Sequence, residues 1–354
     1  MKIAIVAPVM IPIPPPNYGG IERIVSELAF GLAGRGHEIT VFCSGGSTIS
    51  GNNLRKIETT PYPVMQDLKN IRAWEEKEIR AVLAMEKEFD AIHFNYEPVI
   101  LRFGTVEAYK NLLDDFTVPV VLTFHNSTDV PAHQAYYKSA ISLRRHTAIF
   151  ISENQRSRVP FFPKSMVIYN GIPVEEFSVA DTKENFLLFL GRINPVKGVL
   201  EAISVAKKTN IPLIIAAQID AGSPGFFEQE VKPLIDGTFV RYVGEVGFRD
   251  KVEYLKNARV LLFPIRWEEP FGLVMIEALA CGTPVVAFRR GSVPEIIQDG
   301  INGYIVNTLE EMVRAVPLCD NISPRTCRKS VEGRFSVERM VNEYEDVFKR
   351  LAEV

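Results

Sequence analysis

FPIRWEEPFGLVMIE runs from Phe263 to Glu277, in the second half of the chain. The apolar run Val260–Ile265 that leads into it predicts a buried strand, and the apolar residues from about Leu273 to Ala280 predict a helix. Gly282, directly after that helix, is a C-cap signal, and Thr283 opens the next apolar run. The stretch therefore predicts a strand, a short loop, a buried helix and a second strand, which together form a unit of a parallel α/β sheet.

The predicted helix is apolar all round, which indicates burial on most sides, yet it carries Glu277 in its middle. A carboxylate rarely enters such surroundings without a hydrogen-bond partner or a cleft to face. At the start of the helix, Gly272 leaves room for a ligand near the unpaired backbone N–H groups, where anions bind well. One helix thus offers a phosphate cradle at its N-terminus and a carboxylate further in, an arrangement that suits a nucleotide sugar.

Each of the two carboxylates in this stretch also has a plainer explanation. Glu269 can complement the positive end of the helix, and Glu277 can be a structural carboxylate that holds a neighbouring loop. Together, around the Pro-Phe-Gly turn, they resemble the Glu-x7-Glu signature of the retaining glycosyltransferases of family 4, which have the GT-B fold. The resemblance also covers Gly282–Val286 and Gly291–Gly303, and it extends over nearly the whole chain.

The composition is that of a globular protein with two domains. The chain has 354 residues, which is too many for one ordinary core, and 47% are hydrophobic against 23% charged. The net charge of -3 gives no general attraction to nucleic acid or to anionic membranes. Four scattered cysteines indicate reduced thiols, with neither a disulfide framework nor a zinc site. The chain opens on an apolar strand without a signal peptide, and no apolar run approaches the roughly 20 residues that span a bilayer, so we expect a cytoplasmic protein.

Both halves of the chain alternate short apolar runs with helical patterns, which predicts two parallel sheets covered on both faces. The resemblance implies two Rossmann-like αβα domains that face each other across a cleft. We expect an N-terminal domain of residues 1–172 and a C-terminal domain of residues 173–335. Apolar residues at helical spacing predict an amphipathic helix from Ser336 to about Ala352. The resemblance implies that this helix crosses back and completes the first domain. The predicted strands are Lys2–Ala7, Glu38–Cys43, Ala91–Phe94, Val118–Phe124 and Ala148–Ser152, then Phe186–Leu190, Pro212–Ala217, Val240–Val243, Ala258–Pro264, Pro284–Phe288 and Tyr304–Val306.

Ligands of such sheets bind where loops leave the carboxyl ends of the strands. After the first strand, Gly19 and Gly20 open a helix, where paired glycines let backbone N–H groups approach a phosphate; a plain flexible helix start is the alternative. No Gly-x-Gly-x-x-Gly pattern follows that strand, which argues against a dinucleotide dehydrogenase. His125 directly follows Val120–Phe124, so it lies at the ligand edge of the sheet, although a lone histidine is more often structural. The segment His93–Glu97 is expected beside it, on the acceptor side.

Two cations lie at the carboxyl end of the strand Phe186–Leu190. Arg192 and Lys197 flank a tight turn, where they can clamp a diphosphate, with arginine forming a fork of hydrogen bonds and lysine acting as a point charge. Alone, such a pair is ordinary surface charge. The spacing Gly-Arg-x4-Lys-Gly is similar to the diphosphate clamp of the family, however, so we predict a functional role.

The resemblance implies a role for each residue of a donor site. Glu277 holds the ribose hydroxyls, and Glu269 meets hydroxyls of the transferred sugar. The charge on the departing diphosphate is stabilised by Arg192, Lys197 and the N–H groups of the turn. His125 contacts the sugar near the reacting carbon, and the leaving phosphate helps to deprotonate the acceptor. The remaining donor-binding residues that the resemblance implies are Gly19, Gly20, Val246 (through its backbone, to the base), Phe271, Gly272, Leu273 and Val274.

No cofactor and no catalytic metal are expected, because aspartates are scarce around the candidate site and there is no Asp-x-Asp pair. The expected partners are a UDP- or GDP-sugar and a glycan, lipid-linked or small-molecule acceptor. Residues 138–164 hold six basic side chains and one acidic one, either as a solvated face or as a surface for an anionic or lipid-linked acceptor at a membrane. The sequence specifies neither the donor sugar and its base nor the acceptor.

Other functions remain open at this point. Two carboxylates are typical of a double-displacement hydrolase, but Glu277 lies in a helix behind the phosphate cradle, too far back for that role. A GT-B epimerase needs acid and base residues that are not in matching places, and a phosphorylase would carry pyridoxal phosphate. A sugar-nucleotide-binding protein without catalysis is the alternative from another class. The complete set of Arg192, Lys197, Glu269 and Glu277 argues against it.

Overall fold

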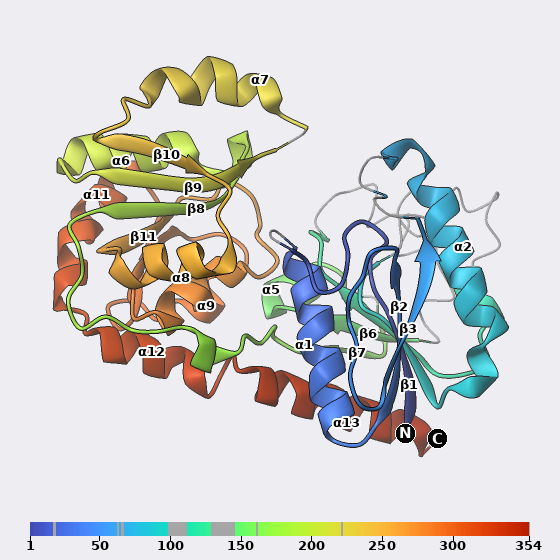
Figure 1. Cartoon of the computed structure of the whole chain (residues 1–354). Coiled ribbons are helices and arrows are strands. Elements are labelled where there is room, and N and C mark those ends of the chain that lie inside the picture. Colours follow the sequence, from blue (N-terminus) through green and yellow to red (C-terminus); the bar gives the residue numbers. More distant parts are fainter. Residues whose placement is uncertain are drawn as a thin grey trace. The chain divides into compact units, whose positions relative to one another are not determined.

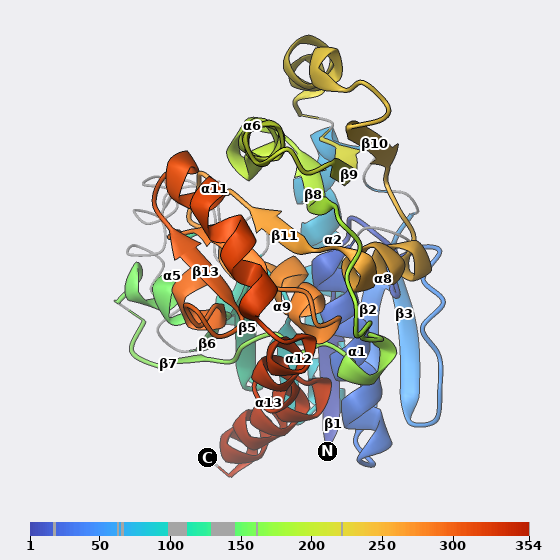
Figure 2. The same cartoon turned by 90° about the vertical axis from the view of Figure 1, so that its left-hand side faces the viewer.

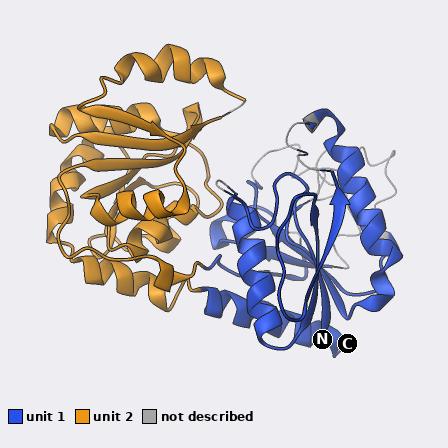
Figure 3. Ribbon diagram, in the orientation of Figure 1, with its two compact units in different colours: residues 1–171, 337–354 blue, residues 172–336 orange. Residues whose placement is uncertain are grey.

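The computed structural model describes residues 1–16, 19–61, 64, 67–97, 112–128, 146–160, 162–220 and 222–353. The chain forms two compact units (Figure 3). Unit 1 consists of residues 1–171 and 337–354, and unit 2 of residues 172–336. Among the described residues, no helix is both long and apolar enough to cross a membrane.

The described residues of unit 1 form a seven-stranded parallel sheet with the order β3-β2-β1-β4-β5-β6-β7. The helices α1 and α13 contact each other, whereas α2 packs beside β3 (Figure 1). The strands are β1 (Lys2–Val6), β2 (Glu38–Ser44), β3 (Leu54–Thr60), β4 (Ala91–Phe94), β5 (Val120–Phe124), β6 (Thr147–Phe150) and β7 (Ser165–Val167). The helices in the described part of this unit are α1 (Gly20–Gly34), α2 (Ile71–Ala84), α5 (Glu153–Ser157) and α13 (Val337–Ala352).

Both edge strands of this sheet, β3 and β7, were absent from the strands predicted from the sequence. The sequence of β3 is LRKIETT, and most of its side chains are exposed or half-buried. An edge strand is buried on fewer sides than a central one, so its sequence lacks the apolar run that revealed the others. Helix α2 is flanked by 3-10 turns at Leu68–Asn70 and Glu86–Glu88.

Unit 2 contains a six-stranded parallel sheet with the order β10-β9-β8-β11-β12-β13. The helices α6 and α11 pack together on one face, and α8, α9 and α12 form the layer on the other (Figures 1 and 2). The strands are β8 (Leu187–Ile193), β9 (Leu213–Ile219), β10 (Val240–Gly244), β11 (Val260–Phe263), β12 (Val285–Phe288) and β13 (Gly303–Val306). The helices are α6 (Val199–Thr209), α7 (Pro224–Phe226), α8 (Phe248–Asn257), α9 (Leu273–Ala280), α10 (Val293–Ile296), α11 (Leu309–Leu318) and α12 (Pro324–Glu332). Two parallel α/β sheets were predicted, and this fold class is confirmed.

In each sheet, the strand order reverses beside the first strand of the unit. In unit 2 the chain passes from β8 to β9 on one side and later returns to β11 on the other side of β8. In unit 1, β1 lies in the same way between β2 and β4. Loops that leave the carboxyl ends of two such neighbouring strands diverge and leave a crevice, where ligands of open α/β sheets bind. The topology therefore marks the loops after β8 and β11, and those after β1 and β4.

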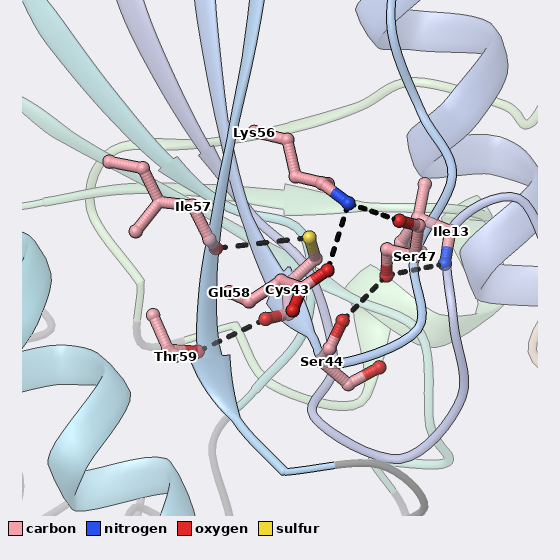
Figure 4. A network of polar contacts seen from close by, with 8 residues as sticks. All are labelled: Ile13, Cys43, Ser44, Ser47, Lys56, Ile57, Glu58 and Thr59. Carbon is pink, nitrogen blue, oxygen red and sulfur yellow. Dashed lines mark hydrogen bonds and ion pairs between the residues drawn. The ribbon is translucent and has the colours of Figure 1, made fainter.

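The loop after β1 is held by a polar network that joins it to β2 and β3 (Figure 4). The backbone N–H of Ile13 donates to Oγ of Ser47 at 2.9 Å, and this hydroxyl donates to the carbonyl of Ser44 at 2.7 Å. The ammonium of Lys56 donates to the carbonyl of Ser47 at 2.5 Å and to Glu58 at 2.8 Å. The edge strand β3 thus fixes the path that the chain takes towards α1.

Helix α13 follows unit 2 in the sequence but packs in unit 1. Its Tyr344 hydroxyl lies 2.9 Å from Oγ1 of Thr123, which in turn lies 2.8 Å from Nε2 of His93. All three side chains are buried, and burial, together with the nearby His125, lowers the pKa of His93 to about 3. Against α1, a Cβ built on Gly31 would lie only 2.4 Å from Cγ2 of Val341, so the two helices meet where α1 has no side chain.

This close approach predicts that alanine will destabilise the protein more at Gly31 than at Gly34, in the same helix. Gly31→Ala places a methyl group against Val341, and such overpacking costs about 1–3 kcal/mol. Gly34→Ala is the matched control, because nothing lies within 4 Å of its Cβ position, and we expect it to change stability by about 1 kcal/mol or less. Urea unfolding of both variants measures the difference. Equal stabilities would show that the α1–α13 contact accommodates a methyl group.

The buried His93 predicts a loss of stability in acid. The folded state keeps His93 neutral down to a pKa of about 3, whereas an unfolded histidine titrates near 6.5. Below about pH 6.5 the unfolded chain binds a proton that the folded chain does not. Stability therefore falls as the pH falls from about 6.5 towards 3.

Between pH 7 and pH 5, we expect this histidine to contribute a loss of about 2 kcal/mol. His93→Gln keeps a polar group near Thr123 but does not titrate, and should therefore flatten the pH dependence of the free energy of unfolding by that amount. Parallel pH curves for the wild type and the variant would contradict the prediction.

Candidate functional site

A glycine allows the loops after β8 and β11 to approach each other closely. Gly198 has a φ of +79°, and a Cβ at that position would lie 2.0 Å from the carbonyl oxygen of Pro264. Only glycine permits both this conformation and this distance. The turn before it is closed by Asn194, whose side chain accepts from the N–H of Lys197 at 3.1 Å. The ammonium of Lys197 consequently lies beside the residues that follow β11.

The predicted cation and carboxylate meet in this place. Nζ of Lys197 lies 2.5 Å from Oε2 of Glu269, and both side chains are largely buried. Arg192 lies near the carboxyl end of β8, and its guanidinium lies 3.5 Å from Asp220, which follows β9. Asn194 also donates to Asp220, at 3.0 Å. The structure thus gathers the predicted residues Arg192, Lys197 and Glu269 around the carboxyl ends of β8 and β11, and adds Asp220, which the sequence did not reveal.

The turn after Glu269 leads into α9 as predicted. Gly272 is the N-cap, with a φ of +83°, and no side chain in the described part of the chain caps the first turn of the helix. Leu273 and Val274 are half-buried there. The side chain of Phe271, in contrast, is buried and packs edge-on against Phe335 at 5.8 Å between ring centroids. The side chain of Phe271 therefore shapes the turn, and a contact of this residue with the donor stays a prediction.

Glu277 is 5% exposed inside α9, and its partner was not predicted from the sequence. Nζ of Lys251, on α8, lies 2.5 Å from Oε1 of Glu277. The same ammonium lies 5.3 Å from the ring centroid of Phe248, a cation–π distance. A charge inside an apolar helix requires some partner. The spacing of residues along the sequence does not show that this partner lies on a different helix. Val246, predicted to meet the base, is half-buried in the loop that precedes α8.

The other end of α9 is held by two cations. Arg328 donates to the carbonyl of Ala280 at 2.9 Å, and Lys183 donates to that of Cys281 at 3.0 Å. Burial lowers the pKa of Lys183 to about 8, so it is still mostly protonated at neutral pH. Positive groups at a helix C-terminus complement its negative dipole end. The helix that carries Glu277 is therefore fixed at its far end, while its N-terminus remains uncapped by side chains.

In unit 1, Gly19 and Gly20 begin α1. Gly19 has a φ of +153°, and a Cβ there would lie 2.6 Å from Pro15 and 3.0 Å from Oε2 of Glu22. Glu22 is buried, and burial raises its pKa to about 7. The two residues before Gly19 lie outside the described part of the chain.

His125 follows β5 and is fixed from several sides. Its Nε2 lies 2.7 Å from Oδ1 of Asn95, and its backbone N–H donates to one carboxylate oxygen of Glu97 at 3.1 Å, while the N–H of Asn126 donates to the other at 3.1 Å. Gln155 donates to the carbonyls on either side of His125, at 3.0 and 2.7 Å. Burial lowers the pKa of His125 to about 3, so the imidazole is neutral and donates its Nε2–H to Asn95.

These contacts give the segment His93–Glu97 a role that its sequence did not suggest. Asn95 and Glu97 hold the loop that carries His125; whether this segment also lines an acceptor site stays a prediction. Of the basic residues within 138–164, those at 138, 144 and 145 lie outside the described residues. Arg156 is engaged locally, 3.4 Å from Glu153. Within the described ranges, no group of three or more His, Cys, Asp or Glu side chains is arranged to hold a metal ion.

Comparison with known proteins gives matches along most of the chain. The model of the family described as "Glycosyltransferase Family 4" matches residues 18–176, and that of "Glycosyl transferases group 1" matches residues 174–316. A phosphatidyl-myo-inositol mannosyltransferase of Mycobacterium tuberculosis is 24% identical over 91% of this chain and 86% of its own length.

Solved structures share the fold at lower identity. A sucrose-phosphate synthase of Thermosynechococcus elongatus has a TM-score of 0.81 at 19% identity, and the match covers 99% of each chain. The Anabaena protein HepE, solved with UDP and glucose, has a TM-score of 0.75 at 18% identity over 99% of this chain and all of that one. With the two sheets and the two matching family models, the assignment is plain. The chain belongs to the family 4 glycosyltransferases of group 1, and it is an enzyme of the hexosyltransferase type with the GT-B fold.

Proposed function

We propose that this enzyme transfers a sugar from a nucleoside diphosphate sugar to an acceptor, with retention of the anomeric configuration and without a metal or cofactor. The observation that carries the proposal is the Lys197–Glu269 pair beside the open N-terminus of α9, at the carboxyl ends of β8 and β11. Cation, carboxylate and free N–H groups converge there on the crevice where α/β sheets bind ligands. Each of these groups suits one part of a nucleotide sugar.

The diphosphate is assigned to Arg192, Lys197 and the start of α9. An ammonium has three donors, so Lys197 can keep one hydrogen bond to Glu269 and direct the others to phosphate oxygens. The guanidinium of Arg192 adds a fork of donors, and the backbone N–H groups of Leu273 and Val274 add the positive end of the helix. The family resemblance is what assigns these residues to the donor, and their geometry is compatible with that assignment.

Two carboxylates are assigned to the two sugars of the donor. Glu277 accepts hydrogen bonds from the ribose hydroxyls, with Lys251 holding its Oε1. Glu269 accepts from hydroxyls of the transferred sugar. In unit 1, neutral His125 and the N–H groups at Gly19 and Gly20 are the candidate contacts to the sugar and the phosphate. The backbone at Val246 is the candidate contact to the base.

In the transfer, the bond between the anomeric carbon and the leaving phosphate oxygen breaks, and a bond to the acceptor oxygen forms on the same face. The negative charge that develops on the diphosphate is stabilised by Arg192, Lys197 and the N-terminus of α9, which is electrostatic catalysis. The leaving phosphate oxygen takes the proton of the acceptor hydroxyl, so no separate protein base is assigned.

HepE was solved with UDP and with UDP-glucose, which supports a nucleotide sugar as donor; we propose a UDP- or GDP-sugar. The acceptor is a glycan, a lipid-linked molecule or a small molecule. Four free and buried cysteines are consistent with a reducing compartment, and we propose a cytoplasmic location. A peripheral membrane contact through residues 138–164 belongs to this proposal only for a lipid-linked acceptor.

Nucleotide binding is the first step to test. We expect one nucleotide family among UDP, GDP, ADP and dTDP, with their common sugars, to raise the melting temperature of the wild type. At 100-fold excess over Kd, the stabilisation is about 2.7 kcal/mol. Glu277→Gln, which keeps the shape of the side chain but removes its charge, should lose most of that shift, because a carboxylate is the stronger acceptor for hydroxyls.

Glu310→Gln, at an exposed position in the first turn of α11, is the matched control and should retain the shift. The absence of a shift with every nucleotide would remove the donor from the proposal. Pyridoxal phosphate in the purified protein would then favour a phosphorylase, and a donor that is bound but never cleaved would favour a binding protein.

The stereochemistry and the metal requirement can be read from one reaction. With excess EDTA and an α-linked donor such as UDP-glucose, slow transfer to water should proceed at the rate seen with added Mg²⁺. Proton NMR should detect the α anomer of the released sugar first, before it equilibrates in solution. An initial β anomer would refute retention, and a reaction abolished by EDTA and restored by Mg²⁺ would refute metal independence.

A further inference from the structure

The loop after β11 carries a tryptophan that the proposed function does not use. Trp267 lies two residues before Glu269 and is half-buried. Its indole N–H donates to Oε2 of Glu269 at 2.9 Å. The ammonium of Lys197 contacts the same oxygen at 2.5 Å and lies 4.8 Å from the centroid of the indole ring. Three side chains from two loops thus form one cluster around a single carboxylate oxygen.

The backbone of Glu269 is fixed as firmly as its side chain. Its carbonyl accepts from the N–H of Ser292 at 3.0 Å. Gly291 has a φ of +52°, and a Cβ there would lie 2.1 Å from that carbonyl oxygen and 2.4 Å from the amide nitrogen of Glu269. The chain therefore passes directly over the glutamate without room for a side chain. With main chain and Oε2 both held, little freedom remains for the carboxylate to turn.

We infer that Trp267 is a positioning residue for sugar recognition: by holding Oε2 of Glu269 together with Lys197, it presents Oε1 to a hydroxyl of the transferred sugar. This inference rests on the proposed role of Glu269. A carboxylate that could rotate would meet many hydroxyl arrangements equally well, whereas one fixed oxygen discriminates between sugars that differ at one carbon. Trp267 consequently influences which sugar is accepted without having to touch it.

The position of Lys197 strengthens the inference. The same ammonium is proposed to bind the diphosphate, so it links the phosphate site to the carboxylate that receives the sugar. The indole face stabilises that cation at a cation–π distance, and its N–H shares the oxygen that the cation contacts. Replacing the indole by phenyl keeps a ring near Lys197 but removes the donor to Glu269. Phenylalanine is therefore the substitution that separates the two roles of the side chain.

The test is isothermal titration calorimetry with UDP and GDP and with UDP-glucose and GDP-mannose. For Trp267→Phe, we expect the Kd of the nucleoside diphosphate to stay within about threefold of the wild type, and the Kd of the corresponding nucleotide sugar to rise about tenfold, the size of one charge-assisted hydrogen bond. The matched control is Trp74→Phe. Trp74 is the other of the two tryptophans, and its indole N–H donates to Asp67 in unit 1. Its replacement should change neither the Kd of the nucleoside diphosphate nor that of the nucleotide sugar.

A double-mutant cycle distinguishes positioning from a general packing effect. If Trp267 acts through Glu269, Trp267→Phe should have little further effect in a Glu269→Gln background, because the group that it positions has changed. Additive effects in the cycle, or a nucleotide-sugar Kd within twofold of the wild type in Trp267→Phe, would overturn the inference. Failure of the proposed function would look different, since then the wild type itself would bind none of the four ligands, and the inference would fall with it.

Discussion

The turn after β8 and the end of β11 are in backbone contact, and the arrangement of unit 2 around its candidate site depends on this contact. Gly198 has no Cβ and a positive φ, so the carbonyl of Pro264 can approach it closely. Any larger residue would separate the two loops and with them Lys197 from Glu269. A second glycine, Gly291, has the same function on the far side of Glu269. Two positions without side chains thus determine where the charged side chains meet.

Three cations of the candidate site in unit 2 each face a carboxylate in the ligand-free structure. Arg192 faces Asp220, Lys197 faces Glu269, and Lys251 faces Glu277. Buried charges of one sign would be costly, and pairing offsets that cost while keeping the cations oriented. An incoming diphosphate would meet cations that already have partners, so binding requires these pairs to be shared or exchanged. Under the proposed function, affinity then reflects a difference between two sets of contacts, and the acidic members contribute to the proposed recognition of the donor.

Much of this could be predicted from the sequence, and the remainder has a physical reason. Apolar runs of the central strands and the uniformly apolar α9 indicated the two sheets, because burial on both faces leaves a clear signal. The edge strand β3 left none, since most of its side chains are exposed or half-buried. The motif residues were recognisable by type and spacing. Their partners Lys251, Asn95 and Glu97 come from other elements, and contacts between elements distant in sequence leave no periodic trace.

The placement of α13 has a consequence for how the protein is made. Residues 1–171 are synthesised first, but the layer that α13 contributes to their unit, including Tyr344 against Thr123, is supplied only after all of residues 172–336 has left the ribosome. Domains generally fold as units in the order of their synthesis, yet here the earlier one is incomplete while the later one emerges. The nascent protein therefore exposes an apolar surface around β4 and α1 throughout the translation of unit 2. During that interval a chaperone that binds apolar surfaces would find its substrate in the first unit, and folding would finish there last.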